Sequence, residues 1–585
     1  MRLPDRPLRR AWEWLRGTPT GLVALALAVG TGAGLGAVAF RYLIVWFTEL
    51  FSGRVDYSAT PGAANPLLPG LGRWFVVLAP VAGGLVYGPL IHRFAREARG
   101  HGVPEVMYAV AEHGGRIKPQ VAVVKSLASA LCIGAGGSVG REGPIVQVGS
   151  ALGSTVGQLA RVPESRLRLL VACGAAGGIS ATFNAPIAGV FFALELILGD
   201  FEAESFGIVV LASVVAGAIG RAAFGPAAFL ALPPFQLASM PEYLAYGLLG
   251  VLAALVGVAF TRTLYGVEDL CDRAWRGPEW LRPAAGGLLL GGLLLALPQL
   301  YGVGYPVLEG AVRGRYALGF LLLLLAGKVL ATSITIGIGG SGGVFAPSLF
   351  IGAMLGTAFG LVVHRLFPGA AGPPGAYGLI GMGAVFAGAA RAPITAVLII
   401  FELTGEYSII LPLMAAIVLA AGISRLVTGD TIYTLKLARR GVDLTRSATA
   451  IRMDGLTVAA AMRPLPQPLA PDTLLAALAE RFTAQPDYDA LPVVGPDGTL
   501  HGVVSAREVE QAAAGDATAA TAADLAQTVR PLAAGQPLDR AMAELVHHDG
   551  GGLPVVETAG GQVTGWLSHR DVLVAYTHTL EAAQT

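Results

Sequence analysis

The chain is dominated by long apolar runs that alternate with short polar, glycine-rich or proline-rich stretches. The first run, Gly21 to Phe47, is long enough to cross the ~30 Å core of a bilayer and too long for a signal peptide. Later runs cover about 74–92, 121–160, 168–199, 206–232, 240–263, 284–300, 317–335, 345–366, 376–403 and 408–427. Several do not fit one straight span of about 20 residues, and glycine and proline interrupt them. The pattern predicts a polytopic α-helical membrane protein with tilted, discontinuous helices.

Composition supports this prediction and excludes other classes. Only 14% of the 585 residues are charged, whereas soluble proteins carry about 25%. Hydrophobic residues make up 54%, and 80 residues are glycine, which allows membrane helices to pack closely. A disordered chain, a nucleic-acid-binding protein and an ordinary cytosolic enzyme are therefore excluded. We expect no metal site and no required cofactor.

The net charge of +1 hides a division of the chain into two parts. Residues 1–440 carry a net charge of +10, and residues 441–585 carry −9. Positive residues near the first span favour a cytoplasmic N-terminus, so residues 1–20 are predicted to be a cytoplasmic segment. The arginines in question are Arg2, Arg6, Arg9, Arg10 and Arg16. We expect an integral protein of the plasma (inner) membrane with the acidic tail in the cytoplasm.

The membrane part repeats itself. Residues 133–153, IGAGGSVGREGPIVQVGSALG, match residues 336–356, IGIGGSGGVFAPSLFIGAMLG, at an offset of 203. Residues 184–196, NAPIAGVFFALEL, match residues 391–403, RAPITAVLIIFEL, at an offset of 207. The transmembrane domain, residues 21–440, is therefore predicted to consist of two related halves, about 20–230 and 240–436.

Paired interrupted segments of this kind point to a transporter's binding site near the midplane of the membrane. A helix that begins there leaves its first N–H groups unpaired, and its dipole attracts an anion without a fixed cation. Pro144 and Pro347 suit the first turns of two such helices. The alternative, a nucleotide-binding loop at GIGGSGG, is disfavoured because the flanks are apolar and no Walker lysine follows.

Three motifs in order make the family recognisable: GHGVP at Gly100–Pro104, GREGP at Gly140–Pro144 and GVFAP at Gly343–Pro347, followed by Tyr433. Residues 1–440 resemble the CLC family of chloride channels and chloride/proton antiporters. The resemblance implies inverted repeats and a homodimer in a lipid bilayer, with one chloride pathway in each subunit. The motif residues expected to shape the backbone are Gly100, Pro104, Gly140, Arg141, Gly143, Pro144, Gly343 and Pro347.

The resemblance also implies how chloride is held. The backbone amides of Val344 and Phe345 would cradle the ion together with those near His101 and Gly102, and the Tyr433 hydroxyl would donate to it.

Glu142 would be the gate. A carboxylate is itself an anion, so at a helix start it can occupy the place of chloride until protonation releases it. We expect Arg141 to be structural and to pair with Glu105. Glu195 and Glu402 occupy equivalent positions in the two halves, and we expect them to be structural as well.

Two positions depart from the family pattern. His101 stands where serine is usual, so anion affinity is expected to rise as the pH falls, unless the side chain turns away and the backbone alone binds the ion. Leu196 stands where many antiporters carry an inner proton acid, although Asp200, Glu202 or Glu204 could replace it. Leu196 favours a chloride channel, and a chloride/proton antiporter is the alternative. A nitrate-selective transporter and a CBS-tailed cation transporter are less favoured.

The acidic tail contains a second repeat, in which residues 491–509 match residues 553–572. Each copy predicts strand, turn, strand and helix, and the pair resembles two α/β CBS domains, residues 456–514 and 520–578. In that family a Ser/Thr and an Asp at the last helix contact an adenine nucleotide such as ATP, ADP or AMP. Ser568 and Asp571 match, and so does Ser505, but Glu508 replaces the second Asp. The alternative is a purely structural, dimerising tail.

Overall fold

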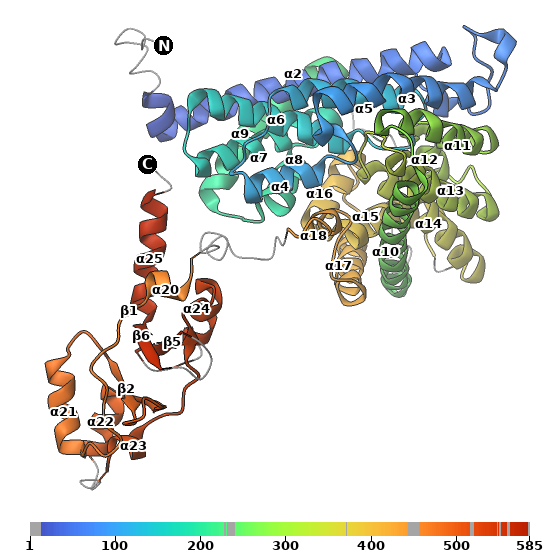
Figure 1. The fold of residues 1–585 in the computed structure, drawn as a ribbon. Coiled ribbons are helices and arrows are strands. Elements are labelled where there is room, and N and C mark those ends of the chain that lie inside the picture. The colour runs from blue at the N-terminus through green and yellow to red at the C-terminus, as the bar shows by residue number, and fades with distance from the viewer. Residues whose placement is uncertain are drawn as a thin grey trace, which may run out of the picture. The chain divides into compact units, whose positions relative to one another are not determined.

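The computed structural model describes residues 13–226, 230, 240–369, 371–442, 456–514, 520–546, 548, 551–557 and 562–582. The chain forms two compact units, residues 1–442 and 443–585 (Figure 1). The expected arginines before residue 13 lie outside the described residues. Each unit is considered by itself below.

Seven of the described helices are long and apolar enough to cross a membrane. They are α2 (Pro19–Ser52), α3 (Phe75–Phe94), α9 (Ala203–Phe224), α10 (Glu242–Ala274), α13 (Leu318–Gly337), α14 (Phe345–Leu366) and α17 (Ile410–Val427). The apolar runs 121–160, 168–199 and 376–403 each break into two or more elements, as the interruptions predicted. The polytopic helical fold is confirmed.

Shorter elements connect these helices. They are η1 (Tyr57–Ala59), η2 (Pro69–Leu71), η3 (Arg96–Ala98), α4 (Val103–Glu112), α5 (Gln120–Gly134), α6 (Glu142–Ala160), α7 (Glu164–Phe183), α8 (Pro186–Phe192), η4 (Ala193–Leu198, a π-helix), η5 (Glu279–Leu281), α11 (Arg282–Ala296), η6 (Pro298–Leu300), α12 (Tyr305–Val312), α15 (Pro374–Ala390), α16 (Pro393–Thr404) and α18 (Thr434–Ala438).

The two halves pack their central helices in the same way. A Cβ added to Gly149 of α6 would lie 2.1 Å from the carbonyl oxygen of Gly174 in α7. At the equivalent place, a Cβ on Gly352 of α14 would lie 2.3 Å from the carbonyl oxygen of Gly381 in α15. Larger residues could not occupy these crossings without moving the helices apart. The glycine content of the chain therefore sets the distance between helices.

Two carboxylates join the halves reciprocally. Glu195, at the end of the first half, accepts hydrogen bonds from the backbone N–H groups of Ile394 and Thr395 at the start of α16 (3.2 and 2.8 Å). Glu402, its counterpart in the second half, accepts one from Ala188 at the start of α8 (2.7 Å). Each glutamate satisfies helix-start donors in the other half. The expectation that both are structural agrees with these contacts.

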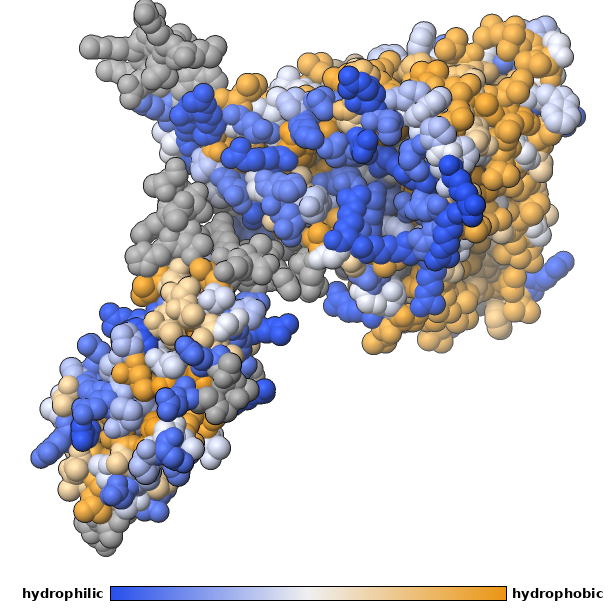
Figure 2. Space-filling model, viewed as in Figure 1, coloured by the Kyte–Doolittle hydropathy of each residue, from blue (hydrophilic) through white to orange (hydrophobic). Residues whose placement is uncertain are grey.

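The outer surface of the membrane unit is largely apolar. Figure 2 shows hydrophobic side chains covering the flank formed by α11 and α13, where Leu288, Leu289, Leu322 and Leu323 are about half exposed or more. Such a continuous apolar flank suits contact with lipid tails rather than water.

The tail unit contains two small sheets with helices packed against them. Strands β1 (Arg463–Pro464), β4 (Leu532–Ala533), β5 (Leu553–Val556) and β6 (Val563–Leu567) form one sheet in the order β1-β6-β5-β4, and β2 (Ala490–Val494) pairs with β3 (Leu500–Ser505). The helices are α20 (Val458–Ala461), α21 (Leu475–Ala484), α22 (Ala506–Ala514), α23 (Ala522–Leu525), α24 (Leu538–Val546) and α25 (His569–Ala582). The predicted strand, strand and helix order is confirmed in both repeats, and the turn of the second repeat, at residues 558–561, lies outside the described residues.

The two repeats of the tail exchange short segments. Val458, which precedes the first repeat's core, packs into the second core beside Leu538 and Leu567. Ala522, which follows the linker, packs into the first core beside Leu491 and Val504. The predicted domain boundaries separate the two sequence repeats, whereas each hydrophobic core contains residues from both sides of the linker.

Candidate functional site

The three glycine motifs converge through backbone hydrogen bonds. The Gly100 N–H donates to the Gly340 carbonyl at 3.0 Å. Gly140 and Gly343 exchange two hydrogen bonds, of 2.7 and 2.6 Å. Loops that lie more than 200 residues apart in sequence are thereby held at one place. The structure brings together what the sequence repeat predicted.

Glu142 is the first residue of α6, and its carboxylate reaches the start of α14. Its Oε2 accepts a hydrogen bond from the backbone N–H of Ala346 at 3.3 Å, and its Oε1 accepts one from the Tyr305 hydroxyl at 2.9 Å. The side chain is only 1% exposed. A Cβ on Gly140 would lie 1.9 Å from Oε2, and one on Gly343 would lie 3.2 Å away. The two glycines leave room for the carboxylate at a helix start, the place that favours an anion.

The motif residues around the gate pack closely enough to require glycine. Gly102 has φ +84°, and a Cβ there would lie 2.8 Å from the Gly143 carbonyl oxygen. A Cβ on Gly143 would lie 1.9 Å from the His101 carbonyl oxygen. Pro144 and Pro347 lie in the first turns of α6 and α14 as predicted, and Pro104 lies in the first turn of α4.

The predicted pairing of Arg141 with Glu105 is wrong. Glu105 instead forms ion pairs with Lys436 (3.2 Å) and Arg440 (2.9 Å). The guanidinium of Arg141 lies 5.4 Å from the centre of the Tyr305 ring, where a cation–π contact is favourable. Arg141 therefore lies beside Tyr305, the partner of Glu142, and not beside Glu105 of α4.

His101 and Tyr433 lie close together, and both are 1% exposed. Their ring centres lie 6.2 Å apart. The Tyr265 hydroxyl donates its single hydrogen to the Ile432 carbonyl at 2.7 Å, so the contact of 3.2 Å between Tyr265 and Nε2 of His101 requires Nε2–H as the donor. The Nδ1 atom of the neutral ring is then an unprotonated acceptor. It is buried and has no hydrogen-bond partner among the described residues.

Val344 and Phe345, whose backbone amides the family resemblance assigns to chloride, lie at the start of α14, and both are buried. Gly102 and Gly343 both lie against Gly143, and Tyr433 lies beside His101. The loops are joined by their own backbone hydrogen bonds.

Sequence reasoning missed Tyr305 and two buried lysines, Lys125 and Lys328. A signal for each was present. GVGYP at residues 302–306 matches GHGVP at residues 100–104 at an offset of 202, and the lysines match each other at 203. A charged residue in an apolar membrane segment is itself a pointer to function.

Leu196, at the position where many family antiporters are expected to carry an inner proton acid, is half-buried within the π-helix η4. Asp200 and Glu202, the suggested replacements, are exposed, and the side chain of Glu204 lies outside the described residues. None of these observations identifies a substitute proton carrier.

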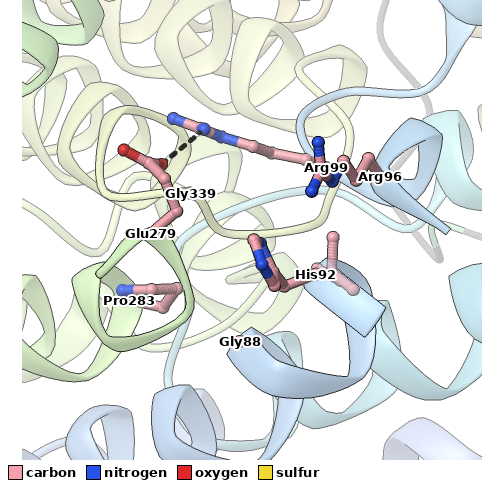
Figure 3. Close-up of a pocket in the computed structure, with 8 residues that line it drawn as sticks. Gly88, His92, Arg96, Arg99, Glu279, Pro283 and Gly339 are labelled. Carbon is pink, nitrogen blue, oxygen red and sulfur yellow. Dashed lines mark hydrogen bonds and ion pairs between the residues drawn. The ribbon is translucent and has the colours of Figure 1, made fainter. Parts of the chain in front are cut away.

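A cavity of about 420 Å³ adjoins the motif loops (Figure 3). His92, Arg96 and Arg99 line one side, and Glu279 pairs with Arg99 at 3.1 Å. Gly339 lies next to Arg99, since a Cβ added to it would be 3.6 Å from Nε of Arg99, and it directly precedes the residue that accepts the Gly100 hydrogen bond. The cavity thus borders the junction of the first and second halves.

In the tail, the four candidate nucleotide residues form helix caps. Ser568 Oγ donates to Asp571 (2.6 Å), and Ser505 Oγ donates to Glu508 (3.0 Å). In each pair the acid also accepts the backbone N–H of the serine. These are capping boxes at the starts of α25 and α22. Asp571 is further held by Arg463 at 2.7 Å.

Comparisons with known proteins agree with this site. A family model described as voltage gated chloride channel matches residues 83–425, and one described as CBS domain matches residues 458–515. The putative chloride channel protein ClcB-like of Ralstonia nicotianae is 35% identical over 432 residues, covering 73% of this chain and 98% of that protein. The H(+)/Cl(−) exchange transporter ClcA of Vibrio parahaemolyticus is 34% identical over 436 residues, covering 72% and 90%.

Solved structures show the same fold. The structure of a slow cyanobacterial Cl−/H+ antiporter matches with a TM-score of 0.65 and 28% identity, covering 73% of this chain and 99% of that one. A eukaryotic CLC transporter matches with a TM-score of 0.61 over 94% of this chain and 97% of that one, at 22% identity, which supports the fold alone. The chain therefore belongs to the voltage gated chloride channel (CLC) family: it is an integral membrane anion transporter with a C-terminal CBS region, not an enzyme.

Proposed function

We propose that this protein exchanges chloride for protons, with Glu142 as the gate and proton carrier. The observation that carries the proposal is the carboxylate of Glu142 at the start of α14, bound by the Ala346 N–H where an anion is favoured. Protonation removes the charge that holds it there, and chloride can then take its place. The expected chloride contacts are the amides of Val344 and Phe345, those near His101 and Gly102, and the Tyr433 hydroxyl.

Exchange is preferred to a channel because of the relatives. The ClcA protein and the cyanobacterial antiporter are both named for chloride/proton movement. The channel that Leu196 favoured is thus the second candidate, supported by that residue and by the name of the ClcB-like relative. The cavity beside Arg96 and Arg99 supports a water-filled approach to the site, since its cationic lining would attract anions.

Reconstitution in liposomes tests the two candidates. Exchange predicts that a chloride gradient drives protons uphill, and that the fluxes keep a fixed ratio. Rapid chloride flux with no uphill proton movement would instead support the channel. Glu142→Gln, a neutral mimic of the protonated gate, should retain chloride flux and lose proton movement.

We further propose that His101 couples proton uptake to anion binding at the inner site. A proton on Nδ1 would turn the buried acceptor into a donor for chloride. Burial of the ring disfavours its charged form, and the nearby side chains of Lys436 and Lys125 add to this effect, so the proton is favoured only when an anion offsets its charge. The alternative remains that the backbone alone binds chloride.

For the assembly, we propose a homodimer in the plasma (inner) membrane with the N-terminus and the tail in the cytoplasm. The basic N-terminal segment supports this orientation. Cross-linking in membranes tests the dimer, and protease access in sealed vesicles tests the orientation.

For the tail, we propose an adenine-nucleotide site at Ser568 and Asp571. Arg463 supplies a cation beside them, which suits a phosphate. Calorimetric titration of the full-length protein with ATP, ADP and AMP tests the site. Arg463→Ala should weaken binding, whereas an absence of heat with all three nucleotides would support the structural, dimerising tail.

A further inference from the structure

The gate glutamate is held by a side chain that the anion motifs do not contain. Tyr305 is the first residue of α12, and its hydroxyl donates to Oε1 of Glu142 at 2.9 Å. The Ala346 N–H holds the other oxygen. Two donors from the second half therefore bind the two oxygens of one carboxylate from the first half.

The position of Tyr305 follows from the repeat. Its loop, GVGYP, corresponds to the anion loop GHGVP. The paired glycines have similar backbone conformations: Gly100 and Gly302 have φ +79° and +63°, and Gly102 and Gly304 have φ +84° and +89°. The second half thus contains its own copy of the anion loop, and this copy presents a tyrosine to the gate.

Each copy of the loop is held by a buried lysine. Lys328 of α13 donates to the carbonyls of Gly302 (3.1 Å) and Val303 (3.0 Å), and to Ser138 Oγ (2.9 Å). Lys125 of α5 donates to the carbonyl of Gly100 at 2.8 Å in the first half. Both lysines have no exposed surface. Lys328 fixes the two residues before Gly304, and so fixes where Tyr305 begins its helix.

We propose that Tyr305 is a latch that holds the ionised gate closed, and that Lys328 is the positioning residue that sets this latch. The inference rests on Glu142 being the gate. A hydrogen bond to a carboxylate is stronger than one to a neutral carboxyl group, so the latch stabilises the closed, ionised state more than the protonated state. When Glu142 takes up a proton the bond weakens, and the hydroxyl becomes available to an anion at the same place.

The test measures chloride flux from liposomes across a series of pH values, with the same pH on both sides. Tyr305→Phe removes the hydroxyl and keeps the ring. Because the ionised gate loses a donor, the pH of half-maximal flux should move upward by about one unit, a tenfold change in proton affinity. Tyr316→Phe, which removes a hydroxyl beyond the end of α12, is the matched control and should leave the midpoint in place.

Lys328→Met provides a second, independent variant. It should move the midpoint in the same direction, both because it releases the Tyr305 hydroxyl and because it removes a cation that acts on Glu142. The shift in the double variant with Tyr305→Phe should therefore be smaller than the sum of the two single shifts. An equal, additive shift in the double variant would overturn the positioning role.

Glu142→Gln separates the latch from the gate. If Glu142→Gln abolishes the pH dependence while Tyr305→Phe keeps the wild-type midpoint, the latch is overturned and the gate stands. If Glu142→Gln keeps the pH dependence, the proposed function itself fails.

Discussion

The two halves of the membrane domain differ most at the residue where the symmetric helices begin. Glu142 opens α6, and at the same offset Phe345 opens α14. The first half supplies a carboxylate, and the second half supplies the N–H of Ala346 that receives it. This one difference within a repeated scaffold separates two similar helix starts into the proposed gate and its receptor.

The loops at residues 100–104 and 302–306, which lead into α4 and α12, also differ between the halves. The first carries His101 toward Tyr433, whereas its counterpart carries Tyr305 to the gate. Both use a buried lysine as an anchor. The scaffold is thus shared, and the chemistry lies in the few side chains that break the symmetry.

The largest expected effect comes from removing the charge of Glu142, which distinguishes the start of α6 from the start of α14. Glu142→Gln should make chloride flux, measured at saturating chloride, independent of pH between about 4.5 and 7.5 and should abolish uphill proton movement, because the gate no longer titrates. Flux assays in liposomes measure both. Glu402→Gln, a neutral change at a half-buried glutamate, should keep the pH dependence. A Glu142→Gln protein that folds but transports no chloride would contradict the gate.

The anchoring lysines should differ both in stability and in function. Lys328→Met leaves the carbonyl oxygens of Gly302 and Val303 without a donor among the described residues, which costs about 1–3 kcal/mol of unfolding free energy. Lys125→Met should cost less, because the Gly342 N–H (3.3 Å) and the Ser341 hydroxyl (2.7 Å) still donate to its two carbonyl partners. Thermal unfolding in detergent measures this loss. Lys125→Met is expected to weaken chloride binding, while Lys328→Met moves the pH midpoint of flux. If the two functional effects were exchanged, the assignment of the loops would be wrong.

The reciprocal glutamates should behave alike if both are purely structural. Glu195→Ala and Glu402→Ala each remove acceptors from a helix start and should lower stability by about 1 kcal/mol. Proton and chloride fluxes, corrected for the amount of folded protein, should change little. Loss of proton movement in Glu195→Ala alone would show that Glu195 carries protons near Leu196.

The smallest effect is expected at His101. In the Glu142→Gln background, where the gate no longer competes, chloride affinity should rise a few-fold as the pH falls below about 6.5, because protonated Nδ1 becomes a donor. Calorimetric titration with chloride measures the affinity. His101→Ser in the same background should give an affinity that does not change with pH. A persisting pH dependence would remove His101 from anion binding.

The fold and the meeting of the motifs were predictable because glycine and proline mark helix starts directly in the sequence. Tyr305 was missed for an identifiable reason: its loop matches at an offset of 202 rather than 203, and only the two glycines and the proline are shared. The partners of Glu105 were beyond sequence reasoning. Lys436 and Arg440 reach it from the far end of the domain, and no local pattern encodes that approach.

The reciprocal helix caps have a consequence for biosynthesis. The N–H of Ala188 is bonded by a carboxylate 214 residues later in the chain. At 5–20 residues per second, the first half spends roughly 10–40 s in the bilayer before the ribosome adds Glu402. Its α8 start remains uncapped throughout that interval. The first half therefore cannot mature alone, and a polypeptide that terminates early would expose an unfinished helix start to membrane quality control.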